Sequence, residues 1–316
     1  MINKRRAFIV GVKSISLSKK EKAFLKKYKP WGVILFSRNI KEFKQIKKLT
    51  SEIKYIFNDD KYPILIDQEG GRVDRLANLI ESSIFTAKFF GDLYSKNKNK
   101  FINYYKIYIS QISYLLKEIG ININTVPVLD IRRNKVSQII GDRSYSSIPK
   151  NISNIGNLCI TEFNKKKIAT VIKHIPGHGL AKVDSHKATP FVKHKKKFLF
   201  KNDFFTFKNK KSFFAMTAHV IYNDIDQIYT ATHSKKIIKL IRKKIGFKNI
   251  IISDDISMKS LKYSIRTNTL KALSAGCNLI LHCNANYSEM KVVAENTPFV
   301  DNFIIKKTSQ FYNFLS

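Results

Sequence analysis

Cysteine is scarce in this chain, and long apolar runs are absent. The three cysteines, Cys159, Cys277 and Cys283, are odd in number and lack the spacing of a zinc site or a redox pair. No apolar run reaches the roughly 18 residues that a membrane-spanning helix needs, and the chain does not open with the pattern of a secretion signal. We therefore expect reduced thiols and a cytoplasmic protein that does not bind a membrane.

Acidic residues are also few, since 23 Asp and Glu stand against 58 Lys and Arg, a formal net charge of +35. Such a potential attracts polyanions without sequence preference. The excess is mostly lysine spread along expected helix faces, whereas arginine, the better reader of phosphates and base edges, is scarce. This pattern favours compositional drift over a specific nucleic-acid partner, with incidental polyanion binding at low salt.

Linkers and low-complexity segments are missing too, and short apolar runs alternate with helical periodicity along the whole chain. Eight strands are predicted: Ala7 to Val12, Trp31 to Phe36, Pro63 to Asp67, Ile121 to Val128, Ile168 to His174, Phe213 to Val220, Asn249 to Ser253 and Cys277 to Cys283. The helices predicted between them include Ser18 to Lys27, Ile40 to Ile56, Ile102 to Ile119, Ile152 to Lys165, Ser234 to Lys244 and Met258 to Ala275. Eight strand-helix units close a barrel, so the prediction is an α/β protein in which residues 1–316 form a single catalytic (β/α)8 TIM-barrel domain.

Polar residues follow the apolar part of six of these strands. They are Asp67, Asp130, His174, His219, Asp254 and Asn284. In a (β/α)8 barrel the carboxyl ends of the strands converge on one face, where catalytic groups lie. A single such residue is more often a helix cap or a satisfied strand-end group. Six in register favour an active site.

The segment 66–75, Ile-Asp-Gln-Glu-Gly-Gly-Arg-Val-Asp-Arg, follows a predicted strand and ends on a basic residue. Asp67 could accept hydrogen bonds from vicinal hydroxyls, and the paired glycines let the backbone turn sharply beside a ligand. Their spacing differs from that of a dinucleotide or phosphate loop.

The segment 173–186 is more specific, because it holds three histidines and an aspartate interrupted by proline and glycines. Such a loop can leave the barrel and fold back over it. Asp184, two residues before His186, could orient its ring and leave the other nitrogen free, so we expect His186 to be a general acid/base. For His178 we expect a structural role in its Gly-His-Gly turn.

Asp254 and Asp255 end an apolar strand, and the pattern predicts a helix directly after them. One carboxylate could face the barrel axis, kept ionised by the helix N-terminus, while Asp255 or Ser257 caps that helix. An ionised aspartate at a barrel mouth suits attack on an anomeric carbon.

With these motifs, the chain resembles a family 3 glycoside hydrolase of the cytoplasmic β-N-acetylhexosaminidase branch, which serves peptidoglycan recycling. The matching blocks are 32–36 with Arg38-Asn39, 66–75, 127–130, 141–144, 173–179 with 184–186, 216–220, 253–258 and 275–277. The chain departs from the usual sequence of the branch at Tyr145-Ser146, at Asn278 and at 230–234. The last segment usually opens with proline, where this chain has Thr230.

The resemblance implies that Asp254 is the nucleophile and that His186, paired with Asp184, is the acid/base. It further implies a sugar site made of Asp67, Arg75, Arg143, Lys173 and His174. It also implies retaining removal of terminal β-linked N-acetylglucosamine from muropeptide fragments, namely N-acetylglucosamine joined to 1,6-anhydro-N-acetylmuramic acid with or without peptide. No cofactor and no metal are implied, and the sequence sets no oligomeric state.

Three alternatives remain open at this point. A histidine acid/base repels incoming phosphate less than a carboxylate does, so the enzyme could be a phosphorylase of the same substrates. A metal-dependent barrel hydrolase could use His174, His178, His186, His219 and Asp254 as ligands. The last alternative is a non-catalytic polyanion-binding protein.

Overall fold

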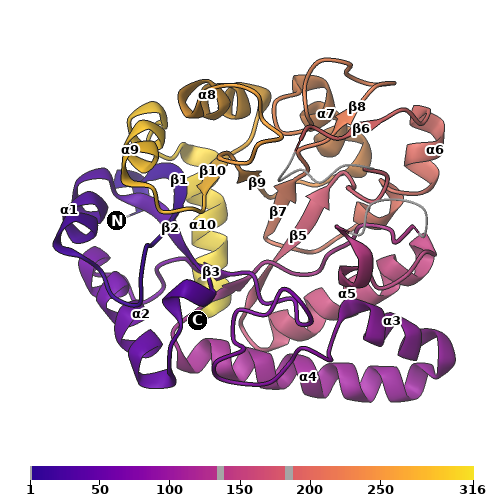
Figure 1. The fold of residues 1–316 in the computed structure, drawn as a ribbon, viewed down its shortest axis with the longest axis horizontal. Coiled ribbons are helices and arrows are strands. Elements are labelled where there is room, and N and C mark those ends of the chain that lie inside the picture. Colours follow the sequence, from indigo (N-terminus) through magenta and orange to yellow (C-terminus); the bar gives the residue numbers. More distant parts are fainter. Residues whose placement is uncertain (1, 134–138, 182–187) are drawn as a thin grey trace.

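The computed structural model describes residues 2–133, 139–181 and 188–316. Eight parallel strands form a closed barrel in the order β1-β10-β9-β7-β5-β4-β3-β2, with β1 paired to both β10 and β2 (Figure 1). The strands are β1 Arg6–Gly11, β2 Pro30–Leu35, β3 Ile64–Ile66, β4 Ile123–Asn124, β5 Ala169–Ile175, β7 Phe214–Thr217, β9 Ile250–Asp255 and β10 Leu279–His282. All eight predicted strands are thus present, and the predicted barrel is confirmed.

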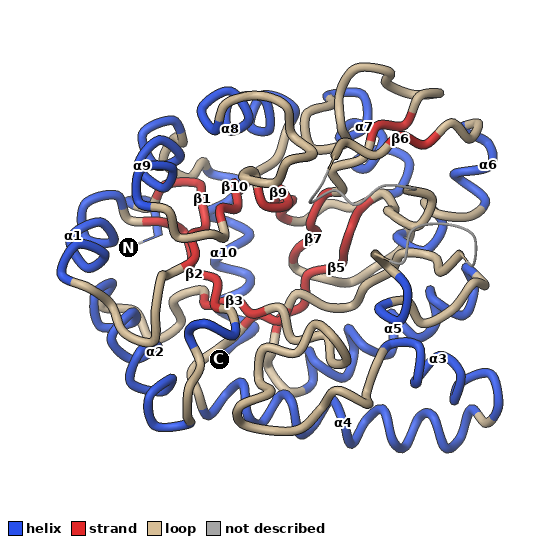
Figure 2. The backbone as a smooth tube through the Cα atoms, in the orientation of Figure 1, coloured by secondary structure: helices blue, strands red, loops and turns tan. Residues whose placement is uncertain are grey.

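Helices surround the strands (Figure 2). They are α1 Lys19–Tyr28, α2 Phe43–Phe57, α3 Ala87–Lys96, α4 Lys98–Glu118, α5 Pro149–Lys165, α6 Lys196–Lys201, α7 Lys235–Leu240, α8 Ile265–Ala275, α9 Tyr287–Asn296 and α10 Asn302–Leu315. A π-helical segment, Ile241–Ile245, continues α7, and a separate two-stranded sheet pairs β6 Phe191–Val192 with β8 Ile221–Tyr222. None of these helices, nor any other in the described part of the chain, is long and apolar enough to cross a bilayer.

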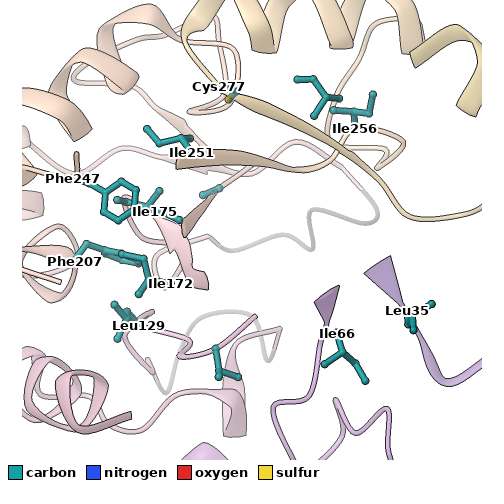
Figure 3. Packing of buried hydrophobic residues seen from close by; sticks show 14 of the residues in the cluster. Leu35, Ile66, Leu129, Ile172, Ile175, Phe207, Phe247, Ile251, Ile256 and Cys277 are labelled. Atoms are coloured by element: carbon teal, nitrogen blue, oxygen red, sulfur yellow. The ribbon is translucent and has the colours of Figure 1, made fainter. Parts of the chain in front are cut away.

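Two apolar layers hold the barrel together. The larger one lies between strands and helices; Leu35, Ile66, Ile172 and Ile251 are among its members (Figure 3). The smaller one fills the barrel interior with the alternate strand residues and includes side chains of α10. Since both faces of a parallel strand are buried in this way, its sequence is apolar nearly throughout.

The helix α10 closes one end of the barrel, where it is seen behind the ring of strands (Figure 2). Its Phe311 packs against Phe214 of β7 with ring centroids 5.5 Å apart, and its Thr308 accepts a hydrogen bond of 2.9 Å from Trp31 of β2. The opposite end, where the strands finish, is left for the polar residues.

Two predicted elements are wrong in extent. The strand predicted over residues 121–128 is assigned only at Ile123–Asn124, because Val126 N–H turns back to the Asn124 carbonyl and Pro127 has no N–H to donate. The chain nevertheless stays beside β5, where Leu129 N–H donates to the Lys173 carbonyl. The helix predicted from Met258 begins only at Ile265, where Ser264 accepts from Thr267 N–H as the N-cap.

Candidate active site

A cavity of about 160 Å³ lies at the carboxyl ends of the strands and is lined by charged side chains from well-separated segments. Six of the predicted site residues line it: Asp67, Arg75, Arg143, Lys173, His174 and Asp254. The proposed acid/base His186 and its partner Asp184 lie outside the described residues.

Asp254 is the last but one residue of strand β9, Ile250–Asp255, and its carboxylate faces this cavity. One of its oxygens accepts the backbone N–H of Asp255 at 2.8 Å. Burial alone would raise the pKa of Asp254, but the nearby imidazoles of His219 and His174, with that N–H, hold it below the usual value. The side chain is therefore ionised at neutral pH.

The reason given by the sequence for that ionisation is wrong. No helix starts beside Asp254, since α8 begins eleven residues later in the sequence, at Ile265, and neither Asp255 nor Ser257 caps it. Asp255 instead accepts hydrogen bonds from the backbone N–H and the hydroxyl of Ser257 and from Cys283 N–H. Of the two aspartates, only Asp254 is among the described residues that line the cavity.

Lys173, on strand β5, is the centre of a charged network that lines the same cavity as Asp254. Its ammonium lies 2.9 Å from Asp67, 2.6 Å from Glu69 and 2.9 Å from the hydroxyl of Thr125, although the side chain is only 2% exposed. Each of the three ammonium donors thus has an acceptor. A lysine held in this way is a fixed positive charge.

Arg143, in the 3₁₀ turn Gly141–Arg143, makes a bidentate pair with Glu69, both bonds at 2.8 Å. Burial would raise the pKa of Glu69, but Arg143 and Lys173 together lower it to about 2. For Asp67, Lys173 and Arg75 likewise outweigh burial and hold the pKa well below its usual range. Both acids are anionic, so the network can donate and accept hydrogen bonds.

Glu69 was not singled out from the sequence, although it stands in the segment 66–75. The available signal was its two-residue spacing from Asp67, which puts two carboxylates on one side of an extended segment. The glycines that follow behave as predicted: Gly70 has φ 88°, and a Cβ there would come within 2.4 Å of the Phe85 carbonyl oxygen.

A second layer of side chains orients His174. Asp130 lies 2.7 Å from its Nδ1, and the same carboxylate accepts the backbone N–H groups of His174 and His178. The contact at Nδ1 leaves Nε2 of His174 for a ligand in the cavity.

His178 lines the cavity as well, with both ring nitrogens buried and without a hydrogen-bond partner among the described residues. Burial, more than His174, lowers its pKa to about 4. The ring is therefore neutral at physiological pH.

The six strand-end residues separate into layers. Asp67, His174 and Asp254 line the cavity, Asp130 lies behind it, and His219 is held between the Thr232 hydroxyl at 2.7 Å and the Asp255 carbonyl at 3.0 Å. Asn284 lines a different pocket and donates to Glu289.

A closed parallel barrel with an ionised aspartate and a hydrogen-bonding cavity at its mouth is the architecture of a barrel glycosidase. The family model described as "Glycosyl hydrolase family 3 N terminal domain" matches residues 6–308 of the chain. The chain therefore belongs to this family. It is a glycosidase. As expected from the sequence, its three cysteines are free thiols.

Similar proteins agree with this assignment. A protein named Beta-hexosaminidase from Haemophilus influenzae is 32% identical over 305 residues, covering 94% of this chain and 84% of that protein. Another of the same name from Shewanella frigidimarina is 31% identical over 286 residues, covering 87% and 81%.

Solved structures agree with the fold. NagZ from Neisseria gonorrhoeae superposes with a TM-score of 0.87 at 25% identity, covering 99% of this chain and 90% of that one. The β-N-acetylglucosaminidase from Thermotoga maritima gives 0.79 at 25% identity, covering 100% and 67%.

Proposed function

We propose that the chain is a retaining β-N-acetylglucosaminidase that removes a terminal, non-reducing N-acetylglucosamine, with Asp254 as the nucleophile. The observation that carries this proposal is the ionised Asp254 carboxylate facing a cavity that is also lined by a fixed network of acids and bases. Supporting it are the relatives named Beta-hexosaminidase and the gonococcal NagZ structure described as a complex with N-trifluoroacetyl-D-glucosamine.

In the first step Asp254 attacks the anomeric carbon while His186, oriented by Asp184, protonates the leaving oxygen. In the second step His186 accepts a proton from water, which releases the sugar from Asp254 with retained configuration. The roles of His186 and Asp184 rest on the 173–186 motif and its family resemblance.

The charged network supplies the hydrogen bonds to the sugar. Arg143 and Arg75 donate, Lys173 donates to a sugar hydroxyl in place of one of its three present acceptors, Asp67 accepts from hydroxyls, and the free Nε2 of His174 completes the set. Because these groups are already paired with one another, they are oriented before the substrate arrives. As substrate we propose N-acetylglucosamine linked to 1,6-anhydro-N-acetylmuramic acid, with or without peptide, in cytoplasmic peptidoglycan recycling.

A metal-dependent mechanism fits the described residues less well. His219 has both ring nitrogens in contact with protein oxygens, and Nδ1 of His174 contacts Asp130. Either ring would have to give up such a contact to bind a metal in the cavity through that nitrogen.

The test is hydrolysis of a chromogenic β-N-acetylglucosaminide and of the matching β-glucoside by wild type and Asp254→Asn, with and without phosphate. Wild type should cleave only the first substrate, give free sugar in both buffers, and lose more than about 10⁴-fold in kcat on substitution. A sugar 1-phosphate as the product would show that the reaction is phosphorolysis and not hydrolysis. An active Asp254→Asn variant would refute the assigned nucleophile.

A further inference from the structure

Two further cavities lie away from the catalytic one, beside helices α7 and α8. The larger has a volume of about 480 Å³ and the smaller of about 50 Å³, and they adjoin, because Tyr229 and His233 line both. Among the described residues, neither shares a lining residue with the catalytic cavity. The larger volume falls within the range of roughly 300–1,000 Å³ typical of small-molecule sites.

Three polar atoms around the smaller cavity are buried without a hydrogen-bond partner among the described residues: Thr230 Oγ1, His233 Nε2 and Ser260 Oγ. Their residues are 4%, 7% and 1% exposed. An unsatisfied buried polar group costs about 1–3 kcal/mol, so three around one small cavity suggest a bound polar group.

The segment that supplies two of these atoms is also one where the chain departs from its family resemblance. Thr230 stands where that segment usually has proline, and the Thr230 carbonyl accepts the backbone N–H of His233, so one turn presents both side chains. Ser260 is brought to the same place by its carbonyl, which accepts the hydroxyl of Thr189 at 2.8 Å.

A positive charge is fixed in the larger cavity. The ammonium of Lys271 on α8 lies 4.6 Å from the ring centre of Tyr229 and 4.7 Å from that of Tyr263. Its contact with the Tyr229 hydroxyl, at 3.4 Å, leaves donors available.

The one carboxylate among the described lining residues, Asp226, is already used within its own loop. It accepts from the Ser234 hydroxyl and from the backbone N–H groups of Ile228 and Tyr229. Two hydroxyls, an imidazole kept neutral by burial and the ammonium of Lys271 therefore remain, and Lys235, Lys236 and Lys262 also line the two cavities. This set suits an oxyanion better than a cation.

We propose that this pair of cavities is an accessory site that binds a small oxyanion, the phosphate or carboxylate group of a low-molecular-weight ligand. The site would be coupled to catalysis through Thr232, which lies between Thr230 and His233 and contacts His219 beside Asp254. The inference stands independently of the proposed substrate.

Isothermal titration of the substrate-free protein with inorganic phosphate, and separately with malonate, tests this at constant ionic strength. We expect saturable binding of one anion, weakened at least tenfold in Lys271→Met and also weakened in the near-isosteric Thr230→Val. Lys243→Met removes the same charge from an exposed position outside the cavities and should bind as wild type does. Comparing the two probes tells a phosphate site from a carboxylate site.

Failure of both anions to bind saturably would overturn the proposal, as would equal weakening by Lys271→Met and Lys243→Met, which would mean a general effect of net charge. Neither outcome bears on the glycosidase assignment, because no sugar substrate is present.

Discussion

At the residue scale, Glu69 connects two of the cations that we assign to sugar binding. It holds Arg143 by two bonds of 2.8 Å and Lys173 by one of 2.6 Å, with its side chain only 5% exposed. Removing one partner of a buried ion pair leaves the other charge uncompensated. The geometry of the sugar site therefore depends on a residue that has no proposed contact with the reacting atoms.

Glu69→Gln should lower the free energy of unfolding by about 3 kcal/mol and raise KM, because Arg143 loses its bidentate acceptor. Urea denaturation and steady-state kinetics measure the two effects. The control is Glu118→Gln, which removes a half-exposed pair with Lys47 at 3.5 Å and should change stability by less than about 1 kcal/mol. Equal stability losses in both variants would contradict the account.

His178 gives a pH dependence of stability. Its pKa is about 4 in the folded protein, against an ordinary value of 6.5, so between these values the unfolded chain binds a proton that the folded chain does not. Stability from this residue is complete above pH 6.5 and is lost as the pH falls toward 4. Asp203, whose pKa burial raises to about 6, acts in the opposite sense, so a variant of His178 is needed to isolate its share.

From pH 7 to pH 5, wild type should lose about 2 kcal/mol more of its free energy of unfolding than His178→Gln does. Urea denaturation at the two pH values measures this difference. His194→Gln, at an exposed histidine, should keep the slope of wild type. If His178→Gln shows the wild-type slope, the ring is not buried in its neutral form.

At the scale of elements, helix α3 positions the turn that carries Arg143. Gly91 of α3 packs so closely on this region that a Cβ there would lie 1.6 Å from the Tyr145 carbonyl oxygen. The tyrosine itself is held by a 2.7 Å hydrogen bond between its hydroxyl and that of Tyr105 on α4. A displaced α3 would therefore move the segment 141–146.

Gly91→Ala should lower the free energy of unfolding by about 2 kcal/mol or more and raise KM, because the backbone of Tyr145 must shift. Thermal denaturation and kinetics measure both. Gly156→Ala on α5 is the matched control: its Cβ would meet the flexible end of Leu129, which can move away, so the loss should be smaller. A larger loss in the control would contradict the packing argument.

Secondary structure was predictable from sequence wherever burial gives the apolar residues a simple spacing along the chain. All eight strands follow from apolar runs, and α5 ends at Lys165 as predicted. The segment 258–264 was not predictable, since its helical pattern is overruled by tertiary contacts such as the hydroxyl of Thr189 with the Ser260 carbonyl. The prediction that Asp254 is ionised was right for a wrong reason, because its neighbours His219 and His174 come from other strands.

At the scale of the whole molecule, the barrel brings together residues that are far apart in sequence. Lys173 contacts Asp67, 106 residues away, and Arg143 contacts Glu69, 74 residues away. The motifs placed Asp67 at the carboxyl ends of the strands, and their family resemblance implied that Arg143 and Lys173 join it in one sugar site. They could not predict which charges pair, since pairing depends on side-chain directions that only the closed barrel defines.

The most direct test of the central claim is to trap the covalent intermediate. The protein is incubated with a 5-fluoro-N-acetylglucosaminyl fluoride, which slows release of the sugar, and its intact mass and peptides are then measured. We predict a mass increase of one fluorosugar, located on Asp254 and absent from Asp254→Asn. A sugar attached to another residue, or hydrolysis with inversion and without any adduct, would contradict the claim that Asp254 is the nucleophile of a retaining glycosidase.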